Sequence, residues 1–235
     1  MATLGEMATG IAHELNQPLT VIKSASNYIL RKTRDKTPIK DEIMTTMAEE
    51  IDGQVDRASK IINHMREFGR KADVKQEKAD MNKALVNAFD IFRQQLKLHQ
   101  IQVVQDLDPE LPEVLADENR LEQVFINLLI NARDAIDSKN SSDEKAGEKQ
   151  IFLATTTSGN WIMATIEDTG TGIPETVVDK IFDPFFTTKE AGKGTGLGLS
   201  ISYGIIKDYD GQISVANTAR GARFTIRFPR LVPGA

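Results

Sequence analysis

The first 72 residues carry the feature that most constrains the fold, an apolar stripe at helical spacing that occurs twice. In residues 4–29 and again in residues 43–65, apolar side chains recur every three or four positions, which is typical of one face of an α-helix. The segment TRDKTPIKDE between them has the charges of a loop, with Pro38 placed for the first turn of the second helix. Two such helices cannot bury both stripes alone, so we expect a helical hairpin that forms a homodimeric four-helix bundle.

The composition changes near residue 72. Four of the 16 glycines lie in residues 1–72, and nine lie between Gly170 and Gly221. Helical patterns follow Asp80 and Asp117, which can cap them. Patterns typical of strands occupy residues 101–107, 151–157, 161–167, 212–217 and 223–228, and residues 138–149 have the polarity of a surface loop. We therefore expect two domains, residues 1–72 and 73–235, the second an α/β sandwich with a mixed sheet.

Charge and composition exclude several classes of function. The net charge is −5, divided as +1 in residues 1–72 and −6 in residues 73–235, which argues against a nucleic-acid partner. The absence of cysteine excludes disulfides, thiolate metal sites and a cysteine nucleophile. No apolar run approaches the ~20 residues of a membrane span, and even the apolar segment at residues 124–130 is interrupted by Asn127. We expect a soluble, cytosol-compatible chain that does not insert into a membrane.

His13 is a candidate nucleophile. Ile11 and Leu15 belong to the inner stripe, so His13 points outward from the helix, next to Glu14. Pro18 should kink the helix close by. The Glu14 carboxylate can accept a proton from one ring nitrogen while the other attacks. A lone helical histidine is more often a plain surface or packed residue, and a zinc site is disfavoured because HELNQ lacks the second histidine of HExxH.

Two further patterns are ambiguous when taken singly. Asn127 and Asn131 share one helical face, so their amide oxygens could ligate Mg²⁺, or they could simply belong to a polar face. Asp168 follows a strand and precedes Gly170 and Gly172, which suits a tight turn against the flat ring of a ligand or an ordinary turn.

A glycine-rich loop, GKGTGLGLS at residues 192–200, runs into a helical segment. Alternating glycines let backbone N–H groups surround anionic oxygens at a helix N-terminus, which favours a phosphate-binding loop. The segment is not a Walker A motif, because no GK[ST] ends it. Just before it, FDPFFTTK contains aromatic side chains and ends in Lys189, which could reach a terminal phosphate.

Together these segments resemble the sensor histidine kinases of two-component signalling. GIAHELNQPL resembles the H box, NLLINARDAI the N box, DTGTGIP the first glycine box, FDPFFTTK the F box, and GKGTGLGLS the second glycine box. The residues of the FDPFFTTK and GLGLSISYGI segments are most similar to those of the nitrogen-regulation and dicarboxylate-sensor branch. The resemblance implies a dimerisation and phosphotransfer domain followed by an ATP-binding domain of the Bergerat (GHKL) fold.

The resemblance also implies the site residues and the cofactors, ATP and Mg²⁺. His13 would be the phosphoacceptor and Glu14 its base, Asn131 with Asn127 would hold Mg²⁺, and Asp168 would bind the adenine amino group. The implied nucleotide-binding residues are Asn127, Asn131, Asp134, Asp168, Gly170, Gly172, Ile173, Phe182, Lys189, Gly194, Thr195, Gly196, Leu197, Gly198 and Leu199.

Two positions bear on which reaction is expected. Asn127 stands where the family's ATPases have a glutamate that activates water, so direct ATP hydrolysis should be poor. Gln17 stands where Thr or Asn often supports phosphatase activity, and its longer side chain disfavours that activity. By resemblance the partner is the receiver domain of a response regulator. We expect a cytoplasmic chain, and it could be the cytoplasmic part of a membrane-bound sensor.

Two other functions stay open from the sequence alone. One is a GHKL-type ATPase or nucleotide-gated clamp, which would release phosphate without labelling the protein. The other is a catalytically inactive dimerisation module, which would not bind Mg·ATP.

Overall fold

The computed structural model consists of a helical hairpin and an α/β unit, each described by itself. The backbone is described for residues 2–69, 76–142, 147–189 and 194–230. Side chains within these ranges are described except those of residues 2–14, 57, 60–61, 63–69 and 140–142.

The hairpin consists of α1, Ala2–Arg34, and α2, Asp41–Gly69, as the two apolar stripes predicted. Pro18 lies inside α1. The expectation for Pro38 is wrong, because α2 begins three residues later. The Lys40 carbonyl accepts the Met44 N–H, and the acidic residues of the first turn stabilise the positive end of α2 there.

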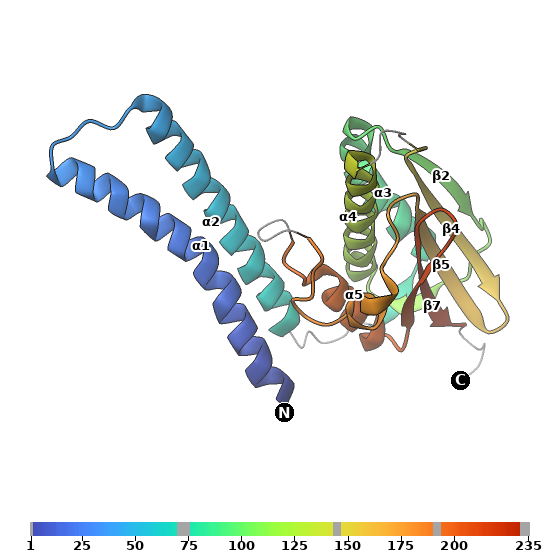
Figure 1. Cartoon of the computed structure of the whole chain (residues 1–235). Helices are drawn as coiled ribbons and strands as arrows, with labels where there is room; N and C mark the ends of the chain where they lie inside the picture. Colours follow the sequence, from blue (N-terminus) through green and yellow to red (C-terminus); the bar gives the residue numbers. More distant parts are fainter. Residues whose placement is uncertain (1, 70–75, 143–146, 190–193, 231–235) are drawn as a thin grey trace. The chain divides into compact units, whose positions relative to one another are not determined.

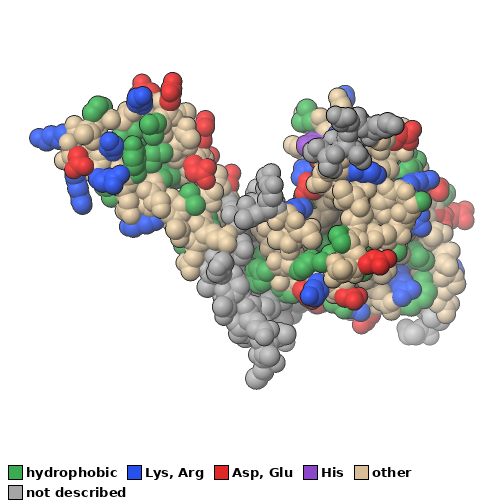
Figure 2. Space-filling view, in the orientation of Figure 1, with side chains coloured by type: hydrophobic (Ala, Val, Ile, Leu, Met, Phe, Trp, Pro, Cys, Tyr) green, Lys and Arg blue, Asp and Glu red, His purple; other side chains and the backbone are tan. Residues whose placement is uncertain are grey.

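The hairpin leaves most of its apolar surface open. Among its described side chains only Pro18 is buried. Figure 2 shows hydrophobic side chains gathered along it. The large hydrophobic side chains that are exposed are Leu19, Val21, Leu30, Ile43, Met44, Val55 and Ile62. Such a surface is large for a helix pair that stands alone.

The α/β unit contains a five-stranded sheet in the order β2-β4-β5-β7-β6. Its strands are Gln102–Leu107 (β2), Gln150–Ser158 (β4), Trp161–Asp168 (β5), Gln212–Asn217 (β6) and Ala222–Pro229 (β7). β2 is parallel to β4, and the other neighbours are antiparallel. The predicted strands and the predicted mixed sheet are confirmed.

Three helices cover one face of this sheet (Figure 1). They are Met81–Leu98 (α3), Glu118–Ser142 (α4) and Gly198–Asp208 (α5). Asp80 and Asp117 cap α3 and α4, as predicted, by accepting backbone N–H groups of the first turn. Alternate residues of β5, Ile162, Ala164 and Ile166, are buried beneath the helices. The core therefore lies between the helices and the sheet. The loop that follows β5 lies outside this core.

Three features were not predicted. α4 continues to Ser142, so the start of the expected loop at residues 138–149 is helical. Lys139 explains part of this, since its Nζ donates to the Thr169 carbonyl at 2.8 Å and holds the last turns of α4 beside β5. The chain also forms a small antiparallel sheet of β1 (Glu77–Ala79) and β3 (Val114–Ala116), and a 3₁₀ helix, η1 (Glu175–Lys180). These elements are too short to give a periodic sequence pattern. No helix in the described part of the chain is long and apolar enough to cross a membrane.

Candidate functional site

One face of α4 links two loops that the sequence singled out. Asn127, Asn131 and Ala135 recur at four-residue spacing, so they share this face. At one end, a Cβ added to Gly198 would lie 3.7 Å from Asn127 Cγ. At the other end, a Cβ added to Gly170 would lie 2.6 Å from the Ala135 Cβ, so only glycine fits there. Two helical turns separate these ends by about 12 Å, and Asn131 lies between them.

The Asn127 amide joins α4 to the first turn of α5. Its Nδ2 donates to the Gly198 carbonyl at 3.2 Å and to Ser202 Oγ at 3.3 Å. The Ser202 hydroxyl is fully buried and itself donates to the Gly198 carbonyl at 2.9 Å. Asn127 therefore supports the helix that follows the glycine-rich loop, a role that the sequence did not reveal.

The Asp168 carboxylate lies at the end of β5 and is only 3% exposed. It accepts hydrogen bonds from the N–H groups of Gly170 (2.8 Å) and Ala222 (3.4 Å). Burial raises the pKa of Asp168, and these two backbone donors offset the rise only in part. A Cβ added to Gly221 would lie 2.5 Å from the Asp168 carbonyl oxygen, so backbone packs tightly behind the carboxylate.

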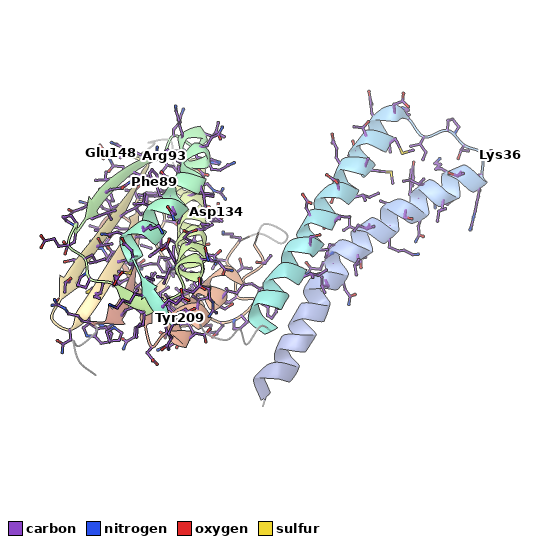
Figure 3. The ribbon with its side chains drawn as sticks, turned by 180° about the vertical axis from the view of Figure 1, so that it is seen from behind. Lys36, Phe89, Arg93, Asp134, Glu148 and Tyr209 are labelled. Atoms are coloured by element: carbon purple, nitrogen blue, oxygen red, sulfur yellow. The ribbon has the colours of Figure 1, made fainter. Side chains whose placement is uncertain are left out.

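The segment after Asp168 is anchored on both sides. The Thr169 hydroxyl donates to the Glu148 carbonyl at 2.7 Å, beside the start of β4, where Figure 3 labels Glu148. Lys139 Nζ donates to the Thr169 carbonyl on the other side. Further along, Gly172 has a φ of +69°, and the Ile173 N–H and carbonyl both bond to the Asn217 side chain.

Glu167, the neighbour of Asp168, points to the opposite face of the sheet. Arg223 donates to its carboxylate through Nε (3.0 Å) and an η nitrogen (2.6 Å), and the Thr218 hydroxyl donates at 2.8 Å. Burial alone would raise the pKa of Glu167, but these bonds outweigh burial and lower it. Two adjacent carboxylates thus have opposite electrostatic environments.

Lys189 and the loop of residues 194–198, which by the resemblance would form a lid over the phosphates, are only partly described, because residues 190–193 lie outside the described ranges. The Phe182 ring packs on Tyr203 with centroids 5.5 Å apart. Lys189 and Gly194 approach closely, since a Cβ added to Gly194 would lie 3.1 Å from Lys189 Cδ. Gly196 has a φ of +65°.

Other predicted residues have simple surroundings. The Thr195 hydroxyl accepts the Leu197 N–H at 3.5 Å. Leu197 is buried and Leu199 is half-buried. Asp134, labelled on α4 in Figure 3, accepts two hydrogen bonds from the adjacent Arg133, which compensates its charge.

His13 and Glu14 lie in α1, but their side chains are outside the described residues, so the outward orientation of His13 stays a prediction. Gln17 is half-buried on the same helix. Within the α/β unit, α4 lies beside both the Asp168 loop and the start of α5.

Sequence reasoning missed four residues of this site, namely Ala135, Lys139, Asn217 and Gly221. A continuing signal existed for the first two, since positions 127, 131, 135 and 139 extend one period of four along α4. Asn217 is the last residue of β6 and Gly221 ends the turn that follows, and neither belongs to a sequence pattern that points to Asp168.

Comparisons with known proteins agree with this arrangement. The profile of the His Kinase A (phospho-acceptor) domain matches residues 3–73, and that of the histidine kinase-, DNA gyrase B- and HSP90-like ATPase matches residues 116–232. The catalytic domain of the histidine kinase ThkA is 31% identical, with a TM-score of 0.56 over 66% of this chain and 97% of that one. This chain belongs to the sensor histidine kinases.

Relatives of this histidine kinase extend the likeness over the whole chain. The two-component sensor PprA of Pseudomonas aeruginosa is 33% identical over 99% of this chain and 25% of that protein. The histidine-protein kinase AtoS of Escherichia coli is 36% identical over 97% of this chain and 35% of that protein. A crystal structure of ThkA in complex with the response regulator TrrA is 26% identical, with a TM-score of 0.74 over 98% of this chain and 63% of that one. The chain thus spans about a quarter to a third of these two curated relatives.

The histidine kinase fold is an ATP-binding one of the GHKL class, and the residues present fit a nucleotide. The buried Asp168 carboxylate is an acceptor suited to the amino group of a base. Gly170 and Gly221, on either side of it, have no room for a side chain because protein atoms pack against them. Among the described residues no group of three His, Asp or Glu side chains could hold a metal ion. A cation here would therefore depend on the amide oxygens of α4 and on phosphate oxygens, ligands that suit Mg²⁺.

Proposed function

We propose that the chain is the kinase core of a two-component sensor, which transfers the γ-phosphoryl group of ATP to His13. The phosphoryl group then passes to an aspartate in the receiver domain of a response regulator. The α4 face supports this best. It joins the loop of the buried Asp168 carboxylate to the start of α5 across about 12 Å, with Asn131 between them, so the base and the phosphates can be held at opposite ends.

In the first step one His13 ring nitrogen attacks the γ-phosphorus, and the bond to the β–γ bridging oxygen breaks to release ADP. Glu14 accepts the proton from the other ring nitrogen, which raises the nucleophilicity of His13. Phosphoryl transfer needs mainly in-line positioning and neutralisation of charge. Lys189 and the N–H groups of residues 194–198 supply part of that neutralisation.

Asn131, with the oxygen of Asn127, would hold Mg²⁺, which when bound neutralises the phosphates. Asp168 accepts a hydrogen bond from the adenine amino group. Gly170 and Gly172 allow the base to lie against the backbone. Asp134, Ile173, Phe182 and Leu199 complete the pocket and the base of the lid.

The division at residues 1–72 and 73–235 and the homodimer belong to the same proposal. The open apolar surface of the hairpin supports a four-helix bundle with a second copy. ThkA, whose structure includes a response regulator, supports a receiver domain as the partner. The GHKL-ATPase alternative is not favoured, because the Asn127 amide cannot act as the base that activates water.

Radiolabelled ATP tests the proposal. Wild type and His64→Gln, a matched control in α2, should incorporate acid-labile label, and His13→Gln should incorporate none. Label that survives in His13→Gln, or that resists acid, would contradict the assignment. Steady phosphate release without labelled protein would support the ATPase instead.

A further inference from the structure

We propose that Asn217 is a positioning residue for the nucleotide pocket, holding the loop of Gly172 and Ile173 in its binding shape. The inference rests on the proposed function, because that function makes this loop a wall of the ATP site. Asn217 is the last residue of β6 and lies outside all five sequence motifs.

The Asn217 carboxamide makes a two-point contact with one residue of the loop. The Ile173 N–H donates to Asn217 Oδ1 at 2.8 Å, and Asn217 Nδ2 donates to the Ile173 carbonyl at 2.6 Å. The two residues are 44 positions apart. Paired bonds of this kind reproduce the pattern between two strands and fix both the position and the rotation of the Ile173 backbone.

The loop needs such a partner. Gly172 adopts a φ of +69°, where a residue with a Cβ is strained. A Cβ on Gly172 would also lie 3.0 Å from Asn217 Oδ1, so the glycine makes room for the carboxamide. Pro174 follows Ile173 and has no N–H to donate. Asn217 thus provides hydrogen-bond partners for both the N–H and the carbonyl of Ile173, which lies between Gly172 and Pro174.

The turn between β6 and β7 connects Asn217 to the residues that contact Glu167 and Asp168. The Thr218 N–H donates to the Gly221 carbonyl at 2.8 Å, which closes the turn. The Thr218 hydroxyl donates to Glu167, and the Ala222 N–H donates to Asp168. The β6–β7 turn therefore holds both the carboxylate and the loop beside it in fixed relation.

Asn217 is exposed, and both of its bonds are at the surface. Bonds that compete with water contribute little to the free energy of unfolding. A loop that must be ordered when the ligand binds lowers affinity directly, because binding then includes the entropy cost of ordering. Loss of Asn217 should therefore change nucleotide affinity more than thermal stability.

Isothermal titration calorimetry with Mg·ADP on the full chain tests this. Asn217→Ala should raise Kd roughly tenfold. Asn217→Asp keeps an acceptor for the Ile173 N–H but places a second carboxylate oxygen against the Ile173 carbonyl, where Nδ2 donates in wild type. Because two acceptors repel each other, its Kd should rise at least as much as that of Asn217→Ala. The matched control is Asn160→Ala, an exposed asparagine in the turn between β4 and β5. In steady-state labelling, KM for ATP should rise for Asn217→Ala while the rate at saturating ATP stays unchanged.

Three results would overturn the inference while leaving the proposed function intact. They are a Kd of Asn217→Ala within about twofold of wild type, an equal rise in Asn160→Ala, and an Asn217→Asp variant that binds as tightly as wild type. If Asn217→Ala fails to fold, Asn217→Asp decides alone, and a Kd equal to that of wild type would overturn the inference. Wild-type chain that binds no Mg·ADP would overturn the proposed function and this inference with it.

Discussion

At the scale of single residues, the end of β5 separates the roles of two adjacent carboxylates. Asp168 is buried beneath the helices with backbone donors alone, and burial raises its pKa. Glu167 is buried on the opposite face, and despite that burial Arg223 and Thr218 lower its pKa. The alternation of a strand places neighbours on opposite faces, so one carboxylate lies on the side of the proposed nucleotide site while the other pairs with Arg223 of β7 and Thr218 of the preceding turn.

Replacement of Asp168 by Asn should abolish Mg·ADP binding without lowering the melting temperature of the free protein. Because the pKa is raised in the folded state, the folded protein holds this proton more tightly than the unfolded chain. Stability is therefore lost as pH rises through the window above the ordinary aspartate pKa. The variant should melt at or above wild type at neutral pH, and the difference should shrink on acidification. Calorimetric unfolding at several pH values measures this, and a variant that melts lower at pH 7 would contradict it.

Glu167→Gln should show the opposite pH dependence. A lowered pKa in the folded state gives stability that is present above the unfolded pKa and lost as pH falls through the folded one. Since Arg223 is about half exposed, the loss at neutral pH should be about 1 kcal/mol. Urea unfolding at pH 7 and at acidic pH measures the two values. A loss that is equal at both would show that the ion pair is not its cause.

At the scale of helices and strands, the sequence predicted the features that interactions between neighbouring residues determine, namely the positions of strands and the starts of helices. Strand patterns, several of them alternating, located all five strands of the main sheet, and β4, β5 and β7 do bury alternate residues. Capping predicted the starts of α3 and α4, since the orphan N–H groups there need a nearby acceptor. The bonds of Asn217 and Lys139 could not be predicted. Their partners lie 44 and 30 positions away, and only the folded sheet and helix layer brings them together.

The cap of α4 gives a prediction at this scale. The Asp117 carboxylate accepts the N–H groups of Asn119 (2.9 Å) and Arg120 (3.2 Å). Asp117→Ala leaves both donors without this acceptor and should lower the free energy of unfolding by about 1 kcal/mol. Urea denaturation measures it, with Asp106→Ala, an exposed aspartate of β2, as the control. An equal loss in both variants would count against the cap.

At the scale of the whole molecule, the negative charge lies in residues 73–235, whereas the exposed apolar surface lies on the helical hairpin. The net charge of residues 73–235 is −6, so anionic phosphates need the cationic groups of the lid and a bound cation to approach them. The hairpin is close to neutral but exposes its stripe. The α/β unit buries its own core and contains the proposed nucleotide site, whereas the hairpin leaves apolar side chains exposed that the proposed dimer would bury.

The homodimer should therefore be separable from nucleotide binding. Leu19 and Val55, one on each helix, are 52% and 47% exposed, and glutamate at both positions would put carboxylates into the bundle core. A buried, unpaired carboxylate is costly, so the dimer should weaken at least about 100-fold and sediment as a monomer at micromolar concentration. Kd for Mg·ADP should stay unchanged, because the pocket is built from the α/β unit. Asn27→Glu, exposed on α1 away from the stripe, should remain dimeric. Sedimentation velocity decides: a double variant that stays dimeric, or a wild type that is monomeric, would refute the four-helix bundle.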